Sequence, residues 1–337
     1  MFNNKTIFLT GGTGSFGQAF ARHVLSKYKL KKLIIFSRDE LKQFNMQQDS
    51  FFFKNKNKIR YFLGDIRDLY RLDFAMNNVD IVVHAAALKQ VDTGEYNPFE
   101  FIKTNIIGAQ NIIETSLKKN VSKVIALSTD KASSPINLYG ATKLCSDKLF
   151  VSANNYSGTK KTIFSVVRYG NVMGSRGSVI KKFIDLRSTK KPILITDTRM
   201  TRFNITLKQS IDFVDSCFKN MQGGEIFVPK IKSYKILNLK NAIAPKHIVK
   251  IIGTRQGEKL HESLISNSEA ANTVEYKNYF SILDNFILKN KKIKKYFKNL
   301  KNRKCKKLNE EFSYVSNKNK FLTTEELKIL IQKNLIN

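Results

Sequence analysis

Short apolar runs alternate with longer amphipathic segments through the first half of the chain. The runs are rich in Ile, Val, Leu and Phe and end in small or polar residues, as is typical of buried strands. They lie at residues 6–10, 33–36, 60–66, 80–87, 123–127 and 163–168. The predicted helices between them cover residues 18–25, 67–77 and 99–118, and a further one lies around Tyr139. This alternation predicts an α/β fold with a Rossmann-like, doubly wound parallel sheet.

A glycine-rich turn follows the first predicted strand, and a helix is predicted directly after it. The three glycines are spaced so that the backbone can approach a pyrophosphate and the helix N-terminus can point at the phosphates. The strand before the turn and the helix behind it give the context that this motif requires. The sequence therefore predicts a dinucleotide site, and its candidate residues here are Gly11, Thr13, Gly14, Ser15, Phe16 and Gly17.

The end of the second predicted strand carries both basic and acidic side chains. Ser37, Arg38 and Asp39 follow the strand, and Lys42 lies one helical turn further on. An arginine at this point accommodates a ribose 2′-phosphate, whereas an acid binds the 2′-hydroxyl. Arg38 with Lys42 favours NADP, and Asp39 keeps NAD open. Asp39 also suits the N-terminus of a helix.

The third and fourth strands end in further candidates for the same site. Asp65, followed by Ile66, suits a hydrogen bond from an adenine amino group, or else a cap of the helix behind it. Ala85 and Ala86 are small enough to leave space for a ribose, although small residues also permit tight backbone packing. Lys89 lies just beyond them, within reach of a cofactor or a substrate.

Polar residues at 128–131 follow the strand at 123–127, at the edge where open parallel sheets bind ligands. Tyr139 and Lys143 come next and are four residues apart, so they share one face of a helix. An ammonium beside a phenol lowers the pKa of the phenol from about 10 and favours the phenolate. This pairing would make Tyr139 a base near neutral pH. Both could also be ordinary surface residues, but the glycine turn argues for chemistry.

Beyond residue 171 the alternation stops. Gly174 and Gly177 mark a turn, basic loops lie at 199–202 and 254–259, and a strand at 225–228 returns to the main sheet between them. These features predict a smaller, interleaved C-terminal domain whose arginines suit phosphate groups. The predicted division gives 1–172 with 203–230 to an NADP-binding Rossmann domain, and 173–202 with 231–337 to a substrate-binding domain.

Composition narrows the class of protein. The 337 residues are 42% hydrophobic, enough for a sizeable core, and there is no run of 18 or more apolar residues that would predict a membrane span. The three cysteines are far apart and the four histidines lack ligand spacing, so we expect no metal site. The chain runs from Met1 directly into a strand, which leaves no room for a signal peptide. We therefore expect a cytoplasmic protein.

The net charge of +32 arises from 59 Lys and Arg against 27 Asp and Glu. Such an excess favours either a nucleic-acid partner or a basic surface together with an anionic ligand. Lysines are scattered along the chain, and the basic segments, including the one at 289–307, lack the usual nucleic-acid signatures. We expect no nucleic-acid partner.

These motifs together resemble the extended short-chain dehydrogenases/reductases. The resemblance is closer still to the inverting UDP-N-acetylglucosamine 4,6-dehydratases of the pseudaminic acid pathway, and it runs from Thr6 to about Glu262. Relatives usually have His where Gln90 stands, and Trp where Asn204 and Phe321 stand. The matching segments are TGGTGSFG (10–17), SRDELKQ (37–43), GDIRD (64–68), HAAALK (84–89), EYNP (95–98), ALSTDKA (126–132), NLYGATKL (137–144), RYGNVMGSRGSV (168–179) and GEKLHE (257–262).

The resemblance implies a bound NADP that is recycled within each turnover. It assigns removal of the C4 hydroxyl proton to Tyr139, a hydrogen bond to that hydroxyl to Thr129, and placement of the ribose to Lys143. The pair Asp130 and Lys131 would remove the C5 proton and protonate the departing C6 hydroxyl, before hydride returns to C6 and C5 is reprotonated on the opposite face. Retaining relatives have Glu in place of Lys131. A lysine base must be neutral, so we expect desolvation or crowding by Lys143 to lower its pKa.

The resemblance also implies a UDP-sugar substrate and a homo-oligomer. The implied substrate-binding residues are Lys89, Asn171, Ser175, Arg176, Val179, Arg202, Arg255 and Glu258. Two other functions stay open. A related sugar-nucleotide epimerase or reductase would have no use for the Asp130–Lys131 pair, and a non-catalytic basic binding protein would need none of the reacting residues.

Overall fold

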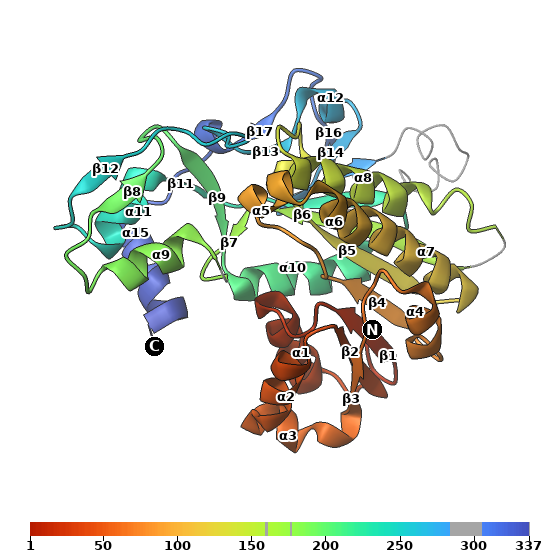
Figure 1. Ribbon diagram of the computed structural model, residues 1–337. Helices are drawn as coiled ribbons and strands as arrows, with labels where there is room; N and C mark the ends of the chain where they lie inside the picture. The colour runs from red at the N-terminus through yellow and green to blue at the C-terminus, as the bar shows by residue number, and fades with distance from the viewer. Residues whose placement is uncertain (159–160, 176, 284–304, 337) are drawn as a thin grey trace.

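A large, mostly parallel sheet forms the centre of the protein (Figure 1). The structure is a computed structural model that describes residues 1–158, 161–175, 177–283 and 305–336. The strands of this sheet are β1 (Thr6–Thr10), β2 (Lys32–Ser37), β3 (Ile59–Leu63), β4 (Ile81–His84), β5 (Lys123–Thr129), β6 (Ile163–Tyr169), β10 (Glu225–Pro229), β14 (Thr273–Glu275), β15 (Tyr279–Leu283) and β16 (Lys306–Lys307).

The order of the strands is that of a doubly wound sheet. Within the described residues it runs β16-β14-β15-β10-β6-β5-β4-β1-β2-β3. Neighbours from β3 to β10 pair in parallel, whereas β15, β14 and β16 are antiparallel. The chain proceeds outward from β1 on one side and from β4 on the other, which confirms the predicted Rossmann-like fold.

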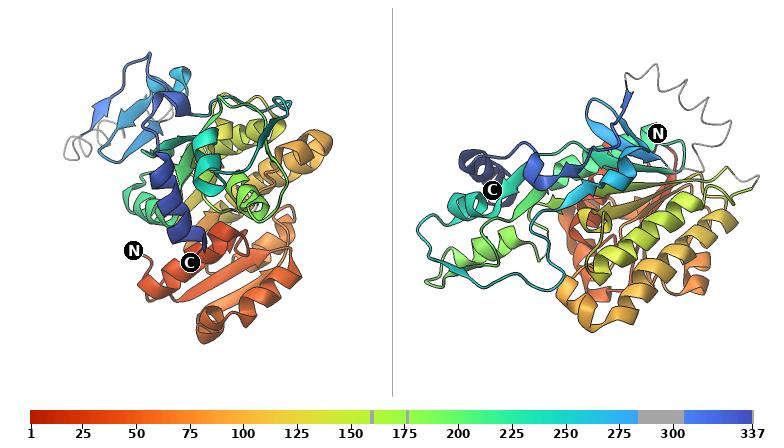
Figure 2. Two further views of the ribbon diagram at one scale, coloured as in Figure 1. Left: turned by 90° about the vertical axis from the view of Figure 1, so that its left-hand side faces the viewer. Right: turned by 90° about the horizontal axis from the view of Figure 1, so that it is seen from above.

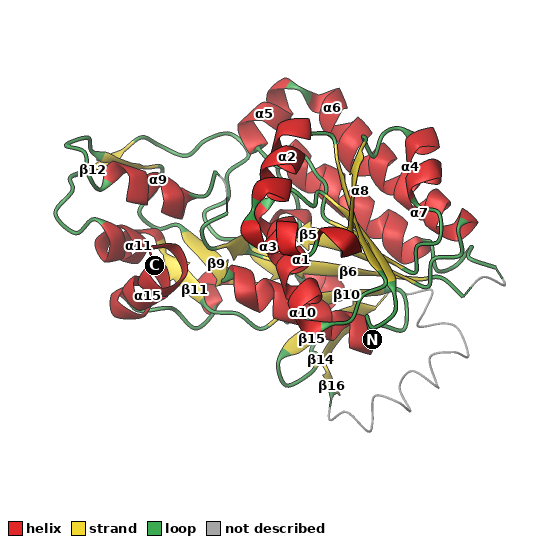
Figure 3. Ribbon diagram, turned by 90° about the horizontal axis from the view of Figure 1, so that it is seen from below, coloured by secondary structure: helices red, strands yellow, loops and turns green. Residues whose placement is uncertain are grey.

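Helices cover both faces of the sheet because successive side chains of a strand point to opposite faces (Figure 3). Ile7 and Leu9 pack on one face in a cluster with Phe218, whereas Phe8 packs on the other face in a cluster with Ile112. The first face is covered by α1 (Ser15–Lys27), α2 (Glu40–Gln48), α3 (Ser50–Lys54) and α10 (Leu207–Asn220). The second is covered by α4 (Leu69–Ala75), α7 (Gly108–Lys118) and α8 (Leu138–Ser152).

The third strand and the helix behind it differ from their predicted bounds. The strand predicted at 60–66 ends at Leu63, and the helix predicted at 67–77 begins at Leu69. The side chain that caps this helix is Asp68 and not Asp65. Asp65 instead pairs with Arg67 and lines the pocket described below.

The strand predicted at 80–87 ends at His84. The next two backbone N–H groups, those of Ala85 and Ala86, donate to the side-chain hydroxyl of Thr10 at 3.1 and 3.2 Å instead of to a backbone carbonyl of a neighbouring strand. The chain therefore leaves the sheet directly after His84 and passes over the end of β1.

The helix predicted at 99–118 is interrupted. It consists of α6 (Pro98–Ile102), a π-helical turn at Lys103–Ile107 and α7, and it is preceded by α5 (Val91–Tyr96). Such turns are rare and often occur at functional sites. Here the turn contains the buried side chain of Asn105.

A smaller part of the protein lies to one side of the main sheet (Figures 1 and 2). Its own apolar cluster includes Phe183, Leu239 and Leu327. Its elements are α9 (Val179–Leu186), α11 (Ile236–Ile243), α15 (Thr324–Ile331), β8 (Ile193–Ile195) with β12 (Val249–Ile251), and β7 (Asn171–Val172), β9 (Thr201–Ile205) and β11 (Ser233–Lys235). The pair β13 (Ser263–Ile265) and β17 (Tyr314–Val315), with α12 (Asn267–Ala270), lies between the two parts.

The chain passes between the two parts more than once. The predicted return strand is confirmed, because β10 pairs in parallel with β6 at Ile226 and Val166. Strands β14 and β15 also join the main sheet, although their residues fall in the range predicted for the second domain. The two-domain division remains a proposal, and the sheet places Thr273–Glu275 and Tyr279–Leu283 with the first part. Within the described residues, no helix has both the length and the apolar character needed to cross a membrane.

Candidate active site

One pocket gathers the predicted residues at the carboxyl ends of the parallel strands. Its volume is about 930 Å³, and the segments after β1, β2, β3, β4, β5 and β6 line it. It lies where the strand order reverses between β1 and β4, which is where doubly wound sheets bind ligands. Every predicted site residue that the structure describes lines this pocket, and Arg176 lies outside the described residues.

The glycine loop between β1 and α1 is shaped by close approaches of the backbone. Gly11 has a φ of 63°, and a Cβ there would lie 2.8 Å from the carbonyl oxygen of Ala85. A Cβ on Gly17 would lie 2.5 Å from the Gly11 carbonyl oxygen. Gly14 precedes α1, which has no side-chain cap and no acidic residue in its first turn among the described residues. The loop therefore offers backbone N–H groups to the pocket, which suits a pyrophosphate.

Of the residues after β2, Asp39 caps a helix and Arg38 extends into the pocket. The side chain of Asp39 caps α2 by accepting from the N–H of Lys42 at 2.9 Å, and it also pairs with the Lys42 ammonium. Arg38 extends toward Asp65, with Nη1 3.6 Å from Oδ2, and its side chain is 53% exposed. Asp65 is held more closely by Arg67, at 2.7 Å. Arg38 can therefore meet an anion in the pocket without disturbing a helix cap.

Asn105 connects the loop after β4 to α8. Its side-chain amide accepts from the N–H of Leu88 and donates to the Leu88 carbonyl oxygen, both at 2.9 Å. It also donates to the hydroxyl of Thr142 at 3.0 Å. Asn105 is thus buried and binds the backbone of the loop. The loop that carries Lys89 is thereby fixed against the helix that carries Tyr139.

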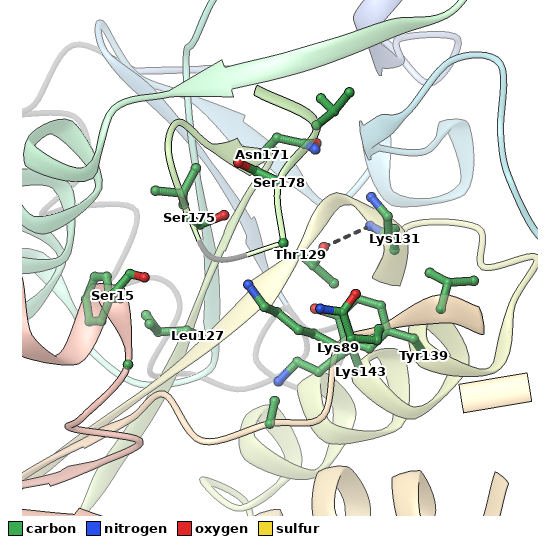
Figure 4. A pocket seen from close by; sticks show the side chains of 18 of the residues that line it. Ser15, Lys89, Leu127, Thr129, Lys131, Tyr139, Lys143, Asn171, Ser175 and Ser178 are labelled. Atoms are coloured by element: carbon green, nitrogen blue, oxygen red, sulfur yellow. Dashed lines mark hydrogen bonds between the residues drawn. The ribbon is translucent and has the colours of Figure 1, made fainter. Parts of the chain in front are cut away.

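The reacting side chains surround one space at the end of β5. Tyr139 and Lys143 lie on one face of α8, with exposed fractions of 9% and 3%. Thr129 ends β5, and its hydroxyl accepts from the N–H of Lys131 at 3.4 Å across the short turn Asp130–Ala132. Figure 4 labels the residues around this space: Ser15, Lys89, Leu127, Thr129, Lys131, Tyr139, Lys143, Asn171, Ser175 and Ser178.

The sequence predicts a lowered pKa for Tyr139, and the structure contradicts this. Burial raises the pKa of Tyr139 to about 12, although the positive charge of Lys131 and hydrogen bonding with Thr129 act in the opposite direction. The cation with the greater influence is Lys131 and not the predicted Lys143. Burial lowers the pKa of Lys143, against the opposing charge of Asp147.

The prediction of a lowered pKa for Lys131 is also wrong. Burial does act to lower it, but the carboxylates of Asp130 and Glu262 outweigh burial and raise the pKa of Lys131. Its Nζ lies 3.2 Å from Asp130 Oδ1 and 3.0 Å from Glu262 Oε1. Lys131 is therefore an ammonium ion at neutral pH.

A buried ionic network anchors α8 to the sheet. Asp147, one turn after Lys143, accepts from the hydroxyl of Ser128 at 2.8 Å and pairs with Arg168 at 3.2 Å. Arg168 pairs in turn with Glu269 at 2.8 Å. The exposed fractions of Arg168 and Asp147 are 0% and 1%, so these charges depend on one another. The network fixes α8, and with it the position of Tyr139 and Lys143.

The predicted arginines on the other side of the pocket have protein partners. Arg202 donates to the carbonyl oxygen of Leu260 at 3.0 Å and pairs with Glu258 at 3.4 Å. Arg255 pairs with Asp92 at 3.1 Å, where both side chains are largely exposed. A further predicted residue, Asn171, has a buried side-chain oxygen without a hydrogen-bond partner in the described part of the chain. An orphaned polar atom of this kind points to a ligand.

The lining residues that the sequence interpretation did not assign to the site include Gln90, Tyr169 and Glu262. Tyr169 and Glu262 belong to the quoted segments 168–179 and 257–262, which is the signal that would have found them. Gln90 approaches Gly177, where an added Cβ would lie 2.8 Å from its amide nitrogen. In the part of the chain that is described, no group of three or more His, Cys, Asp and Glu is arranged to hold a metal ion.

Comparison with known proteins identifies relatives of the whole chain. A family model described as polysaccharide biosynthesis protein matches residues 7–284. An inverting UDP-N-acetylglucosamine 4,6-dehydratase of Campylobacter jejuni is 55% identical over 322 residues, 95% of this chain and 94% of the relative. A UDP-glucose 4-epimerase of Rickettsia bellii is 44% identical over 84% of each chain. The crystal structure of Pen from Bacillus thuringiensis superposes with a TM-score of 0.89 at 35% identity and covers 100% of both chains.

These matches agree with the motifs on which the resemblance rests, and they extend it to nearly the full length of the chain. The glycine loop, the Tyr139–Lys143 pair and the doubly wound sheet are the features of the extended short-chain dehydrogenases/reductases. The chain belongs to the polysaccharide biosynthesis protein family, within this extended short-chain dehydrogenase/reductase group.

Proposed function

We propose that the protein is a sugar-nucleotide 4,6-dehydratase, a lyase. It would convert UDP-N-acetylglucosamine to UDP-2-acetamido-2,6-dideoxy-β-L-arabino-hex-4-ulose with inversion at C5, for a surface glycan of the pseudaminic acid type. The observation that carries this proposal is that Asp130 and Lys131 line the same pocket as Tyr139 and Lys143. A dehydratase needs an acid–base pair for C5 and C6 beside the group that handles C4, and this pocket contains both.

The residues around the glycine loop fit NADP. When bound, NADP would accept a hydride and return it in the same turnover, so that no net oxidation occurs. The loop backbone and the N-terminus of α1 would bind its pyrophosphate, and Arg38 would meet the 2′-phosphate. The carboxylate of Asp39, which would bind the 2′-hydroxyl of NAD, is already engaged by the helix cap and by Lys42. This supports NADP.

The first step assigned to the chain is removal of a proton from the C4 hydroxyl. Tyr139 would take this proton as phenolate, Thr129 would hydrogen-bond the same hydroxyl, and Lys143 would hold the cofactor ribose. Burial of Tyr139 disfavours the phenolate in the free protein. We infer that, when substrate is bound, the positive charges around Tyr139 favour its phenolate and make it reactive as a base.

The second step is loss of water across C5 and C6. The keto group at C4 makes the C5 proton acidic, and the Asp130–Lys131 pair would accept that proton and supply one to the departing C6 hydroxyl. Lys131 lies beside Asp130 at the end of β5, so the two side chains can address different atoms of one sugar. Reprotonation of C5 on the opposite face would then give inversion.

A related epimerase is the second candidate, because the Rickettsia relative carries that name at 44% identity. Epimerisation at C4 would use Tyr139 and Lys143 but would leave the Asp130–Lys131 pair idle. Burying an ammonium with two carboxylates carries a desolvation cost, and only the dehydratase reaction would give this arrangement a use. This favours the dehydratase.

An assay of the purified protein with UDP-N-acetylglucosamine tests the proposal. Nuclear magnetic resonance should show a 4-keto-6-deoxy sugar with inverted configuration at C5. In deuterium oxide the label should appear at C5, and deuterium placed at C4 of the substrate should be recovered at C6. A C4 epimer without loss of water would support the epimerase, and recovery of unchanged substrate would argue against both enzymes.

We also propose a homo-oligomer. Tyr96 on α5 and Phe99 on α6 lie three residues apart and are 88% and 62% exposed, so they offer neighbouring aromatic surface for contact with a second copy. Light scattering of the purified protein should give a multiple of the chain mass of 38.7 kDa.

Replacing Arg38 with Ala should weaken NADP binding while leaving NAD binding nearly unchanged. The guanidinium would lose a charge-assisted hydrogen bond to the 2′-phosphate, worth about 1.5–3 kcal/mol, or roughly ten- to a hundredfold in Kd. Isothermal titration with both cofactors measures the effect. NAD serves as the internal control, since it lacks the phosphate, and an equal loss for both cofactors would contradict this placement of Arg38.

A further inference from the structure

Glu262 reaches the reacting side of the pocket from a distant part of the chain. It directly precedes β13 and is 2% exposed. Its Oε1 lies 3.0 Å from Lys131 Nζ and 3.9 Å from Arg202 Nε. Its backbone is fixed on both sides by Ser316, whose hydroxyl accepts from the Glu262 N–H at 3.0 Å and whose N–H donates to the Glu262 carbonyl oxygen at 2.8 Å. The backbone of Glu262 is therefore fixed in a position from which its carboxylate contacts Lys131.

Lys131 lies between two carboxylates that each keep one oxygen unused. Asp130 Oδ2 and Glu262 Oε2 are buried and have no hydrogen-bond partner within the described residues. Both residues line the pocket. Buried carboxylate oxygens are normally paired, so these two are available to accept or release a proton.

The surroundings of the two carboxylates differ. Burial raises the pKa of Asp130 against the opposing charge of Lys131, and the negative charge of Glu262 adds to the rise. Burial acts in the same direction at Glu262, but Lys131 and Arg202 outweigh it and lower the pKa of Glu262. When two acids in one site are driven apart in this way, one serves as the acid and the other stays ionised. Asp130 is therefore the acid that keeps a proton more readily, and Glu262 is the one that stays ionised beside the Lys131 ammonium.

This arrangement poses a chemical problem for the proposed elimination, because an ammonium ion cannot take a proton from C5. The proton on Lys131 needs an acceptor. Glu262 Oε1 lies 3.0 Å from Lys131 Nζ and belongs to the more readily ionised of the two acids, whereas Asp130, at 3.2 Å, is the more readily protonated one.

We propose that Glu262 is the proton acceptor through which Lys131 works as a base. As the C5–H bond breaks, its proton goes to Lys131 Nζ, one Lys131 proton goes to Glu262 Oε1, and the C5 electron pair moves toward the C4 carbonyl. Asp130 then gives its proton to the C6 oxygen as the C6–O bond breaks and water leaves. A proton returns from Glu262 through Lys131 to Asp130, which restores the protonation of these three residues. The new C5 proton comes from solvent, in balance with the C4 hydroxyl proton that Tyr139 takes and later releases to solvent. This inference rests on the proposed dehydratase function, and Glu262 is a positioning residue that acts through Lys131.

The substitution Glu262→Gln tests this role, since it keeps the size of the side chain but cannot accept the proton. We expect the rate of water loss to fall on the order of a hundredfold at pH 7, while KM changes only a few-fold. Reduced nicotinamide should accumulate, because oxidation at C4 precedes the blocked step. The residual rate should rise roughly tenfold per pH unit, because a neutral Lys131 would then form only by losing its proton to solvent.

The groups that influence this pH dependence face Lys131 from several elements. They are Asp130 in the turn after β5, Tyr139 on α8, Arg202 on β9, Tyr234 on β11, and Lys259 in the loop before β13. Glu275→Gln is the matched control, because Glu275 also pairs with a lysine, Lys230 at 2.7 Å, but does not line the pocket. It should leave the pH profile of the rate in its native position. Glu262→Asp keeps a carboxylate and should retain a native-like profile with a partial loss of rate.

Two results would overturn the proposal. One is a Glu262→Gln profile parallel to the native one, and the other is a Glu262→Asp variant that behaves like Glu262→Gln. If thermal melting shows that Glu262→Gln is unstable, the pH profile of Glu262→Asp tests the proposal instead: a profile that differs from the native one would overturn it.

A readout that is independent of the sugar keeps the two proposals separate. Acetic anhydride acetylates only neutral amines, and peptide mass spectrometry reports the modification of Lys131. Acetylation should begin at a lower pH in Glu262→Gln than in the native protein, since the ammonium has lost its counter-charge. An unchanged onset would overturn the role of Glu262. If the onset of acetylation differs between Glu262→Gln and the native protein, but the native protein does not dehydrate UDP-N-acetylglucosamine, the proposed function is overturned instead.

Discussion

Replacing Tyr139 with Phe should abolish turnover and leave the fold intact. The change removes only the phenol oxygen that takes the C4 proton, and the ring keeps its buried place on α8. Loss of a general base costs about 10²–10⁴-fold in rate, and here no later step can proceed without C4 oxidation. Chromatography of UDP-N-acetylglucosamine consumption and thermal melting together measure the result.

Tyr234→Phe is a suitable control for this substitution. Tyr234 is also fully buried, and its hydroxyl has no hydrogen-bond partner among the described residues, yet it does not line the pocket. Its variant should keep most of the activity. If Tyr139→Phe also kept most of its activity with an unchanged melting temperature, Tyr139 would not be the base.

Replacing Lys131 with Ala should stop the elimination but still permit oxidation at C4. The C5 proton would have no acceptor, so the intermediate should persist and reduced nicotinamide should be visible by its absorbance. The native enzyme should give the C5-inverted product, and retention of configuration at C5 would contradict the inverting assignment even if water were lost.

Lys131→Ala should also lower stability, because it leaves the buried carboxyl groups of Asp130 and Glu262 without their cation. Removing one partner of a buried ion pair costs on the order of 3 kcal/mol. Burial already raises the pKa of Asp130, and the loss of Lys131 would raise it further. A group whose pKa is raised by folding stabilises the folded state at low pH and ceases to do so as the pH rises through that pKa. The melting temperature of the variant, relative to the native protein, should therefore fall as the pH rises.

Lys131→Arg separates the two effects. Arginine keeps the positive charge between the carboxylates but does not lose its proton in proteins. We expect near-native melting and no elimination. An active Lys131→Arg enzyme would show that Lys131 serves only as a charge.

Much of the fold and part of the site follow from local patterns in the sequence. The strand Thr6–Thr10 is recognisable in the sequence because it contains a short apolar run and is followed by a glycine turn. In the structure all five of its residues are buried, and Gly11 in the turn has a positive φ. The four-residue spacing of Tyr139 and Lys143 places both on one helix face whatever surrounds them. Patterns of this kind depend on neighbours in the chain, which the sequence contains directly.

The protonation of the site was decided only by the tertiary structure. The sequence predicts lowered pKa values for Tyr139 and Lys131, but burial raises the first and two carboxylates raise the second. Glu262, one of those carboxylates, lies far from Lys131 in the chain and meets it only because β13 packs beside the turn after β5. Electrostatic energies depend on distance in space and on exclusion of water, and neither can be read from the order of residues.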